Sequence, residues 1–308
     1  MAEQSAKRGE GSGNGKLILF GEHTVVYGAP AIVAGLPGGA TARAVYSDAE
    51  ESVVRLSSKP GETPKQENRG AVDEAFAGVV SEFEAVLDGP VDIEVDVDIP
   101  IGVGLGSSAA FSAAVARALA DLTGADDRIE GAVEAGERVF HGNPSGIDQL
   151  AALRGGLLFY RRGDMTEQAP IEAEAFRIGV CVAGPPASTA EMVEGVAGLR
   201  SREPDLFDYI KLLVGDATRF ASGALREGDW ERVGELMDIN HGALVSLGVS
   251  TSELDEACHI ARDAGALGSK LTGAGGGGCV VALLPESGAG VIEAWESHGL
   301  EAFEVEIE

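Results

Sequence analysis

The sequence predicts a mixed α+β fold in a chain long enough for two domains. Residues 91–99 alternate apolar and acidic side chains, the period of a strand with one face on a core. Residues 71–87 and 206–226 instead space their apolar side chains three and four apart, as amphipathic helices do. With 308 residues and 44% apolar content, the chain can bury a substantial core.

The same two periods, broken by glycine and proline, give the remaining elements in order. We expect strands at 17–20, 31–36, 41–56, 91–99, 157–160, 178–183, 279–284 and 302–307. We expect helices at 71–87, 109–122, 128–140, 206–226, 230–245, 252–264 and 291–297, with a further helix starting near residue 190.

Composition suggests where the domains begin and end. Residues 1–14 are polar and rich in glycine, and we expect them to form a disordered tail. Residues 161–175 are charged and irregular, so we place the domain boundary there. The predicted domains are an N-terminal domain over 15–170 and a C-terminal domain over 171–308.

Charge and cysteine content exclude several classes of function. A net charge of −27 argues against nucleic acid as a partner, since such proteins carry basic patches. The sequence contains no run of about 18 apolar residues, so we expect no membrane span. The N-terminus lacks the apolar core of a signal peptide, and three cysteines without CxxC spacing suit a cytoplasmic enzyme. A homodimer is the expected assembly, although nothing in the sequence itself reveals the oligomeric state.

The excess of acidic over basic residues suggests a host with a salt-rich cytosol, where ions screen the repulsion between carboxylates. An ordinary acidic enzyme is the alternative. On the first hypothesis, the free energy of unfolding rises with KCl concentration. A chain that is fully folded in dilute buffer would contradict it.

A glycine-rich loop follows the strand predicted at 91–99. Pro100 ends that strand, and Gly102, Gly104 and Gly106 occupy every second position. Ser107 and Ser108 then offer hydroxyls to cap a helix. Bare backbone N–H groups at a helix N-terminus favour a phosphate. The alternative is a tight strand-to-helix turn that binds nothing.

Charged residues interrupt the apolar sequence near the N-terminus. Lys16, Glu22 and His23 lie within eight residues of one another among apolar neighbours. Charges in such a setting must be paired or must face a cleft. The alternative to a binding role is an ion pair at the strand end beside a hydrogen-bonded histidine.

Two carboxylates stand at informative positions further along. Glu137 lies one turn beyond Val133 on a predicted helix, so it leans toward the buried face, where Mg²⁺ is a candidate partner. The alternative is a surface glutamate paired with Arg138. Asp148 lies at a loop-to-helix junction, where it takes a proton from a hydroxyl or simply caps the helix.

The C-terminal half contains two further loops of interest. Residues 272–278 are nearly all glycine ahead of a buried strand, which indicates close approach of a ligand or of another loop. A flexible hairpin turn is the alternative. Ser188 and Thr189 precede a helix, where Ser188 is the expected N-cap. We interpret His241 as structural.

These strings resemble those of the GHMP small-molecule kinases. The loop PIGVGLGSSAA is similar to their phosphate loop, and KLTGAGGGG to their third motif. GKLILFGEHTVVYG and AGERVFHGNPSGID resemble, more narrowly, the mevalonate kinases within that family. The resemblance implies two α+β domains: an N-terminal ribosomal-protein-S5-like domain and a C-terminal ferredoxin-like domain. Asn14, in place of the usual proline, and Ala190, in place of a frequent lysine, depart from the pattern.

The resemblance also implies roles for individual residues. Asp148 would be the catalytic base and Lys16 the lysine beside the reacting oxygen. Ser108 and Glu137 would hold Mg²⁺. The acceptor would contact Lys16, Glu22, His23, Thr189 and Gly273. ATP would lie on Pro100, Gly102, Gly104, Leu105, Gly106, Ser107, Ser108 and Ala109.

The implied activity is ATP-dependent phosphorylation of the primary hydroxyl of mevalonate, giving 5-phosphomevalonate for isoprenoid synthesis. One alternative is a sister kinase acting on phosphomevalonate or a sugar. A phosphorylated acceptor would require more basic residues than this chain has near the motifs. The other alternative is a non-catalytic nucleotide sensor.

Overall fold

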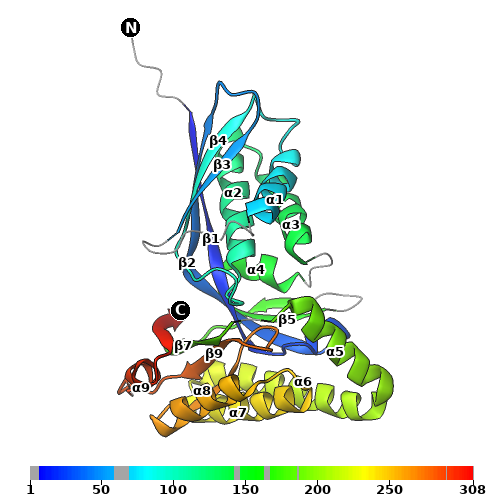
Figure 1. Cartoon of the computed structure of the whole chain (residues 1–308), viewed down its shortest axis with the longest axis vertical. Helices are drawn as coiled ribbons and strands as arrows, with labels where there is room; N and C mark the ends of the chain where they lie inside the picture. The colour runs from blue at the N-terminus through cyan, green and yellow to red at the C-terminus, as the bar shows by residue number, and fades with distance from the viewer. Residues whose placement is uncertain are drawn as a thin grey trace. The chain divides into compact units, whose positions relative to one another are not determined.

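The computed structural model describes residues 7–58, 69–141, 146–162, 167–185, 187–288 and 290–307 (Figure 1). The chain forms two compact units. Unit 1 comprises Met1–Lys16 and Gly35–Gly155, and unit 2 comprises Leu17–Ala34 and Gly156–Glu308. Unlike the contiguous domains expected from composition, each unit is therefore built from two separate stretches of chain.

Unit 1 combines strands with a layer of helices. Its strands are β3 (Val53–Ser58), β4 (Val91–Val97) and parts of β1 (Arg8–Phe20) and β2 (Pro30–Tyr46). Its helices are α1 (Arg69–Ser81), α2 (Ser107–Thr123), α3 (Ile129–His141) and α4 (Ile147–Arg154), with a 3₁₀ turn η3 at Asp126–Arg128. β4 lies between β3, which is parallel to it, and β2, which is antiparallel.

The alternating pattern of β4 is confirmed. Val91, Ile93, Val95 and Val97 are buried, while Glu94 between them is exposed. The helix α2 lies almost wholly in the core, because its many alanines leave room for close packing. The sequence periods therefore predict the strand, the loop and the helix of this segment in the correct order.

The prediction of a disordered tail over residues 1–14 is wrong for the part of it that the structure describes in β1. Residues 8–14 are strand, and their glycines lie against α2. A Cβ on Gly9 would lie 2.0 Å from the Ala118 carbonyl oxygen, and one on Gly13 would lie 2.1 Å from that of Ala110. Glycine at every second position thus lets a strand lie directly on a helix of alanines, rather than marking a tail.

Unit 2 contains a four-stranded antiparallel sheet in the order β10-β7-β9-β8. The strands are β7 (Phe176–Gly184), β8 (Gly268–Leu271), β9 (Gly278–Leu283) and β10 (Glu301–Ile307). The strand β5 (Gly156–Arg161) pairs with β6 (Glu167–Pro170) and with β2, in a six-stranded sheet of order β3-β4-β2-β5-β6 that also includes β1 beside β2. The helices are α5 (Thr189–Arg202), α6 (Pro204–Glu227), α7 (Trp230–Ser246), α8 (Ser252–Asp263) and α9 (Val291–Ser297), with a 3₁₀ turn η1 at Val25–Tyr27.

The core of unit 2 joins the sheet to its helices. Cys181 and Val280 of the sheet pack with Phe207, Leu254 and Trp295 of the helices. All three cysteines are buried and free of disulfides, and burial raises the pKa of Cys181, Cys258 and Cys279 to about 12. These thiols therefore act as small apolar groups. Over the described part of the chain, no helix has the length and apolar character required to cross a bilayer.

Candidate functional site

The glycine loop runs between β4 and α2 in unit 1. Gly102, Gly104 and Gly106 all have positive φ, at 80°, 91° and 76°, which side chains rarely adopt. A Cβ on Gly102 or Gly104 would meet no atom within 4 Å. The loop backbone is therefore uncovered where the first N–H groups of α2 begin, as an anion-binding loop requires.

The predicted capping role of the two serines is wrong. The N-cap of α2 is Gly106, in a left-handed conformation, and the helix begins at Ser107. Ser107 and Ser108 thus occupy the first turn of α2. Their backbone N–H groups are among those for which the helix itself offers no carbonyl acceptor. The Ser108 hydroxyl is instead hydrogen-bonded to Glu137.

Lys16 contacts the glycine loop at Leu105 and Gly106. Its backbone N–H donates to the Leu105 carbonyl at 2.8 Å, and Leu105 is buried. A Cβ on Gly106 would lie 2.5 Å from Cγ of Lys16. Glycine is therefore required at 106 both for its φ and because the lysine side chain passes directly over it.

Gly106→Ala is expected to destabilise unit 1 more than a positive φ alone does, because the new methyl group displaces Lys16. Gly124→Ala is the matched control: Gly124 has a φ of 82°, but its Cβ would meet nothing within 4 Å. Urea unfolding should show a larger loss for Gly106→Ala, by about 1–3 kcal/mol. Equal losses would show that the contact with Lys16 is unimportant.

Lys16 also reaches the predicted base. Its Nζ lies 3.2 Å from Oδ1 of Asp148, and the two side chains are 8% and 21% exposed. Asp148 is in the first turn of α4, whose N-cap is Gly146, so the alternative role as the N-cap does not apply. The Lys16 ammonium therefore compensates the charge of a carboxylate that still faces solvent on one side.

Glu137 lies on α3 with no exposed surface. Arg138, its expected surface partner, instead pairs with Glu134 at 2.5 Å. Burial raises the pKa of Glu137 to about 7, and the nearby charge of Asp148 adds to the rise. A hydrogen bond from Ser108 and the charge of Lys16 oppose it. Glu137 therefore belongs with Ser108, Lys16 and Asp148 in one polar cluster.

The raised pKa of Glu137 predicts a pH dependence of stability. The folded state binds this proton more tightly than the unfolded chain, so the contribution is present at low pH and is lost as pH rises from 4.5 through about 7. The span corresponds to roughly 3 kcal/mol. In chelator, Glu137→Gln should therefore gain stability relative to wild type between pH 5 and pH 8.

Glu134→Gln, an exposed change on the same helix, is the control for that measurement and should follow the wild type. Urea unfolding at each pH gives the comparison. Parallel curves for wild type and Glu137→Gln would contradict the assignment of the shift to Glu137.

Glu22 lies in unit 2, buried in an ion pair with Lys270, a partner that the sequence alone did not identify. Its exposed fraction is 1%, and Oε1 accepts a hydrogen bond from Nζ of Lys270, which is 0% exposed. Oε2 accepts from Nδ2 of Asn240 at 3.2 Å. Lys270 also donates to the Leu271 carbonyl at 2.6 Å. Both oxygens of Glu22 are thus engaged within the protein, as the ion-pair alternative supposed.

His23 follows that buried pair. Among the described residues it is the one non-glycine residue with positive φ, at 59°. Its Nε2 bonds to the Ala274 carbonyl at 2.8 Å, and burial lowers its pKa. A histidine held in an uncommon conformation by a specific bond is typical of a functional position.

The glycine-rich segment 272–278 holds the segment that contains Ile18 and His23 through hydrogen bonds. The Thr272 hydroxyl donates to the Ile18 carbonyl at 2.9 Å and accepts from the Ile18 N–H at 3.2 Å. A Cβ on Gly275 would lie 2.1 Å from the Val249 carbonyl oxygen. Close approach of another loop, rather than a flexible hairpin, therefore accounts for part of the run.

The two remaining predicted acceptor residues occupy different settings in unit 2. Thr189 is exposed as the first residue of α5, after the N-cap Ser188. Gly273 is buried with a φ of 82°, one residue from the carbonyl that binds His23. His241, interpreted as structural, is buried with Nε2 at 3.2 Å from Asp255.

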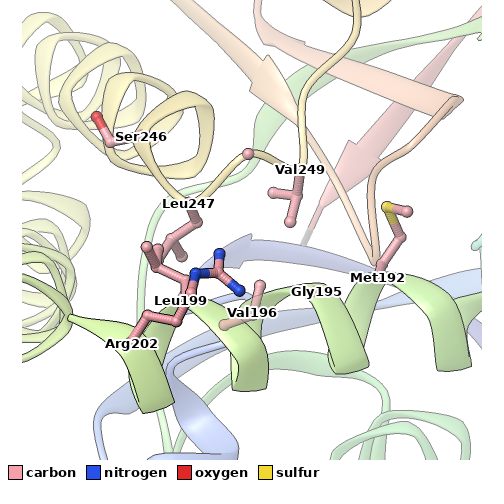
Figure 2. Close-up of a pocket in the computed structure, with 9 residues that line it drawn as sticks. Met192, Gly195, Val196, Leu199, Arg202, Ser246, Leu247 and Val249 are labelled. Atoms are coloured by element: carbon pink, nitrogen blue, oxygen red, sulfur yellow. The ribbon is translucent and has the colours of Figure 1, made fainter. Parts of the chain in front are cut away.

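A cavity of about 270 Å³ lies between α5 and the connection from α7 to α8, and its lining residues are drawn in Figure 2. None of the predicted site residues lines it. The lining is mainly apolar and consists of Met192, Gly195, Val196, Leu199, Arg202, Ser246, Leu247, Gly248 and Val249. All of these lining residues belong to unit 2, and none of them is part of the polar cluster or of the His23 turn.

Comparison with known proteins places the chain in a family. Models of the GHMP kinase N-terminal domain and C-terminal region match residues 72–156 and 221–300. A mevalonate kinase of Thermococcus sibiricus is 34% identical, with 92% of this chain and 91% of that protein covered. One of Aeropyrum pernix is 36% identical, with 89% and 88% covered.

A solved structure supports the same conclusion. The crystal structure of L. major mevalonate kinase with R-mevalonate superposes with a TM-score of 0.87 at 29% identity, covering 99% of this chain and 98% of that one. The mixed helix and sheet content expected for the two GHMP kinase domains is confirmed. The chain belongs to the mevalonate kinase family of the GHMP kinases.

Proposed function

We propose that this protein transfers the γ-phosphoryl group of ATP to the primary hydroxyl of mevalonate. The observation that carries the proposal is the polar cluster of unit 1, in which Lys16, Asp148, Glu137 and Ser108 gather beside the glycine loop. The family supplies the identity of the acceptor. The product, 5-phosphomevalonate, would serve isoprenoid synthesis.

The cluster suits Mg²⁺ bound with a nucleotide. This cation prefers hard oxygen ligands and commonly uses one or two protein groups together with substrate phosphates. Glu137 offers a buried carboxylate and Ser108 a hydroxyl, and they are close enough for a hydrogen bond to act on the pKa of Glu137. When bound, the cation would offset charge that develops on the phosphates.

The remaining steps follow from this chain's own residues. The backbone from Gly102 to Ser108, continuing into α2, would hold the phosphates of ATP. Oδ1 or Oδ2 of Asp148 would accept the proton of the acceptor hydroxyl. Lys16, 3.2 Å from Asp148, would stabilise the negative charge on the transferred group.

In unit 2, His23 is the better candidate for direct contact with the acceptor. Its ring is half-buried and hydrogen-bonded to the Ala274 carbonyl. Both carboxylate oxygens of Glu22, by contrast, already accept hydrogen bonds from Lys270 and Asn240. We therefore assign Glu22 a positioning role at the turn that presents His23. Thr189 and Gly273 remain candidate acceptor contacts.

The decisive experiment is a coupled assay of ADP release with mevalonate, phosphomevalonate, galactose and no acceptor. We expect turnover with mevalonate alone, since the basic residues that a phosphorylated acceptor requires are scarce near the motifs. Turnover with another acceptor would identify a sister kinase. Nucleotide binding without turnover on any acceptor would indicate a sensor.

A magnesium titration tests the metal site. Glu137→Ala should raise the Mg²⁺ concentration needed for half-maximal activity, because one ligand is lost. Glu134→Ala, on the exposed face of the same helix, should leave the titration unchanged. Identical titrations for Glu137→Ala and wild type would remove Glu137 from the metal site.

A further inference from the structure

Asp148 is carried by a helix that is too short to hold its own position. The helix α4 has eight residues, and isolated helices of that length are marginal in water. Its place in unit 1 therefore depends on its neighbours, α2 and α3, against which it packs (Figure 1). Since Asp148 lies in the first turn of α4, any displacement of the helix also displaces the carboxylate that meets Lys16.

Two side chains from other elements hold the C-terminal end of α4. The last carbonyls of a helix find no N–H donor within it. The Ala152 carbonyl accepts a hydrogen bond from Nδ2 of Asn14 at 3.2 Å. The Leu153 carbonyl accepts one from Nη2 of Arg117. A cation at this end also interacts favourably with the helix dipole. The end of α4 is therefore anchored to β1 through an amide and to α2 through a guanidinium.

Arg117 also bonds to the strand that carries Lys16. It lies on α2, and its Nη1 donates to the Ser12 carbonyl of β1 at 2.6 Å. A Cβ on Gly11 would lie 2.8 Å from Cβ of Arg117, so β1 passes directly beside this position. One guanidinium thus joins α2, β1 and α4, and these elements carry Ser108, Lys16 and Asp148.

The surroundings of Arg117 indicate that the shape of its side chain matters. The residue is half-buried, burial lowers its pKa, and in the described part of the chain no carboxylate pairs with it to oppose that shift. Its two donor nitrogens bond to main-chain carbonyls instead. The guanidinium is planar and rigid, so it fixes the distance between two acceptors, which the single ammonium of a lysine does not.

We propose that Arg117 is a positioning residue that sets the place of Asp148 relative to Lys16. It acts through the Ser12 carbonyl of β1 and the Leu153 carbonyl of α4. Ser12 precedes Lys16 by four residues, about 13 Å along a strand. Leu153 follows Asp148 by five residues, about 8 Å along a helix. This role rests on the catalytic functions proposed above for Asp148 and Lys16.

Arg117→Met removes the guanidinium and keeps the apolar stem. We expect kcat to fall by about 10-fold to 100-fold, because misplacing reacting groups by about 1 Å has an effect of that order. The KM for mevalonate and the Kd for ATP should change little, since Arg117 lies about 15 Å along α2 from the first turn. Arg117→Lys should recover only part of kcat. Complete recovery would attribute the effect to charge alone and overturn the proposal.

Combination with Asp148→Asn separates positioning from a general loss of structure. If Arg117 acts through Asp148, then Arg117→Met should lower kcat no further in a chain that already carries Asp148→Asn. A further fall of the same size in that background would contradict the positioning role. So would an Arg117→Met variant with the kcat of the wild type.

Arg177→Met is the matched control. Arg177 is also half-buried and donates to two carbonyls, those of Pro285 and Glu286, at 3.1 and 2.9 Å. It lies on β7 in unit 2, which carries no predicted site residue. Arg177→Met should keep the kcat of the wild type even where its melting temperature falls. Equal losses of kcat in Arg117→Met and Arg177→Met would attribute both to instability and overturn the proposal.

Amide hydrogen exchange reports on α4 independently of turnover. The Leu150 N–H donates to the Gly146 carbonyl at 3.1 Å in the first turn of this helix. Arg117→Met should speed its exchange about tenfold or more, while the amides of β4 exchange as in the wild type. A wild type that does not turn over mevalonate would contradict the proposed function, whereas unchanged exchange in α4 would contradict the role of Arg117.

Discussion

Asp148→Asn is expected to lower kcat by about 10²–10⁴-fold, the usual contribution of a positioned general base. The amide is nearly the same size but cannot accept the hydroxyl proton. It also leaves the Lys16 ammonium, 3.2 Å away, without its counter-charge. The affinity for ATP should change little, because the glycine loop and the first turn of α2 are untouched. Steady-state kinetics and nucleotide titration measure the two effects separately.

Asp126→Asn, an exposed change in η3 of the same unit, is the control and should keep wild-type kinetics. Lys16→Met should also lower kcat, and the double variant should be little worse than Asp148→Asn, because the two side chains act together. Substantial turnover by Asp148→Asn at saturating substrate would remove Asp148 as the base.

Lys270→Met is expected to cost about 3–5 kcal/mol of unfolding free energy, because it leaves the Glu22 carboxylate buried without a cation. The Lys270 ammonium also donates to the Leu271 carbonyl and, at 3.5 Å, to the Ile18 carbonyl, and so joins two segments that are far apart in the sequence. The loss should loosen the Gly21–His23 turn, so kcat/KM for the acceptor should fall along with stability. Urea unfolding and kinetics at low temperature give both quantities.

Replacing both partners, Glu22→Gln with Lys270→Met, should recover part of the lost stability, since no unpaired charge is then buried. Lys211→Met is the matched control, because the exposed pair with Asp208 contributes well under about 1 kcal/mol. A Lys270→Met variant as stable as Lys211→Met would show that the Lys270 ammonium is not required to compensate the buried Glu22 side chain.

The sequence predicted those parts of the fold whose signals are local. The period of β4, the glycine loop and α2 follow from neighbouring residues. The tail was misinterpreted because glycine at 9, 11, 13 and 15 suggested disorder by composition. Its period of two is the signal that was available, and it indicates a strand whose bare face lies on a helix.

The candidate site was found from the sequence only where a residue type was unusual in its surroundings or matched the family. Glu22 attracted attention as a charge among apolar residues, but its partner Lys270 lies at the other end of the chain. No local period relates the two. The spacing of Glu137 from Val133 placed it toward the buried face but left a surface pair with Arg138 open, because a single carboxylate on a helix gives no measure of its burial.

The composition of the two units has a consequence for any attempt to divide the gene. Leu17–Ala34 belongs with Gly156–Glu308. A fragment that starts at Gly156 would therefore lack the Ile18 carbonyl, which accepts a hydrogen bond from the Thr272 hydroxyl. It would also lack Glu22, so that Lys270 would be buried without its counter-ion. The chain therefore does not divide at Gly156 into two segments that would each contain a whole unit. A soluble C-terminal piece would require the 17–34 peptide to be supplied in trans or grafted onto its start.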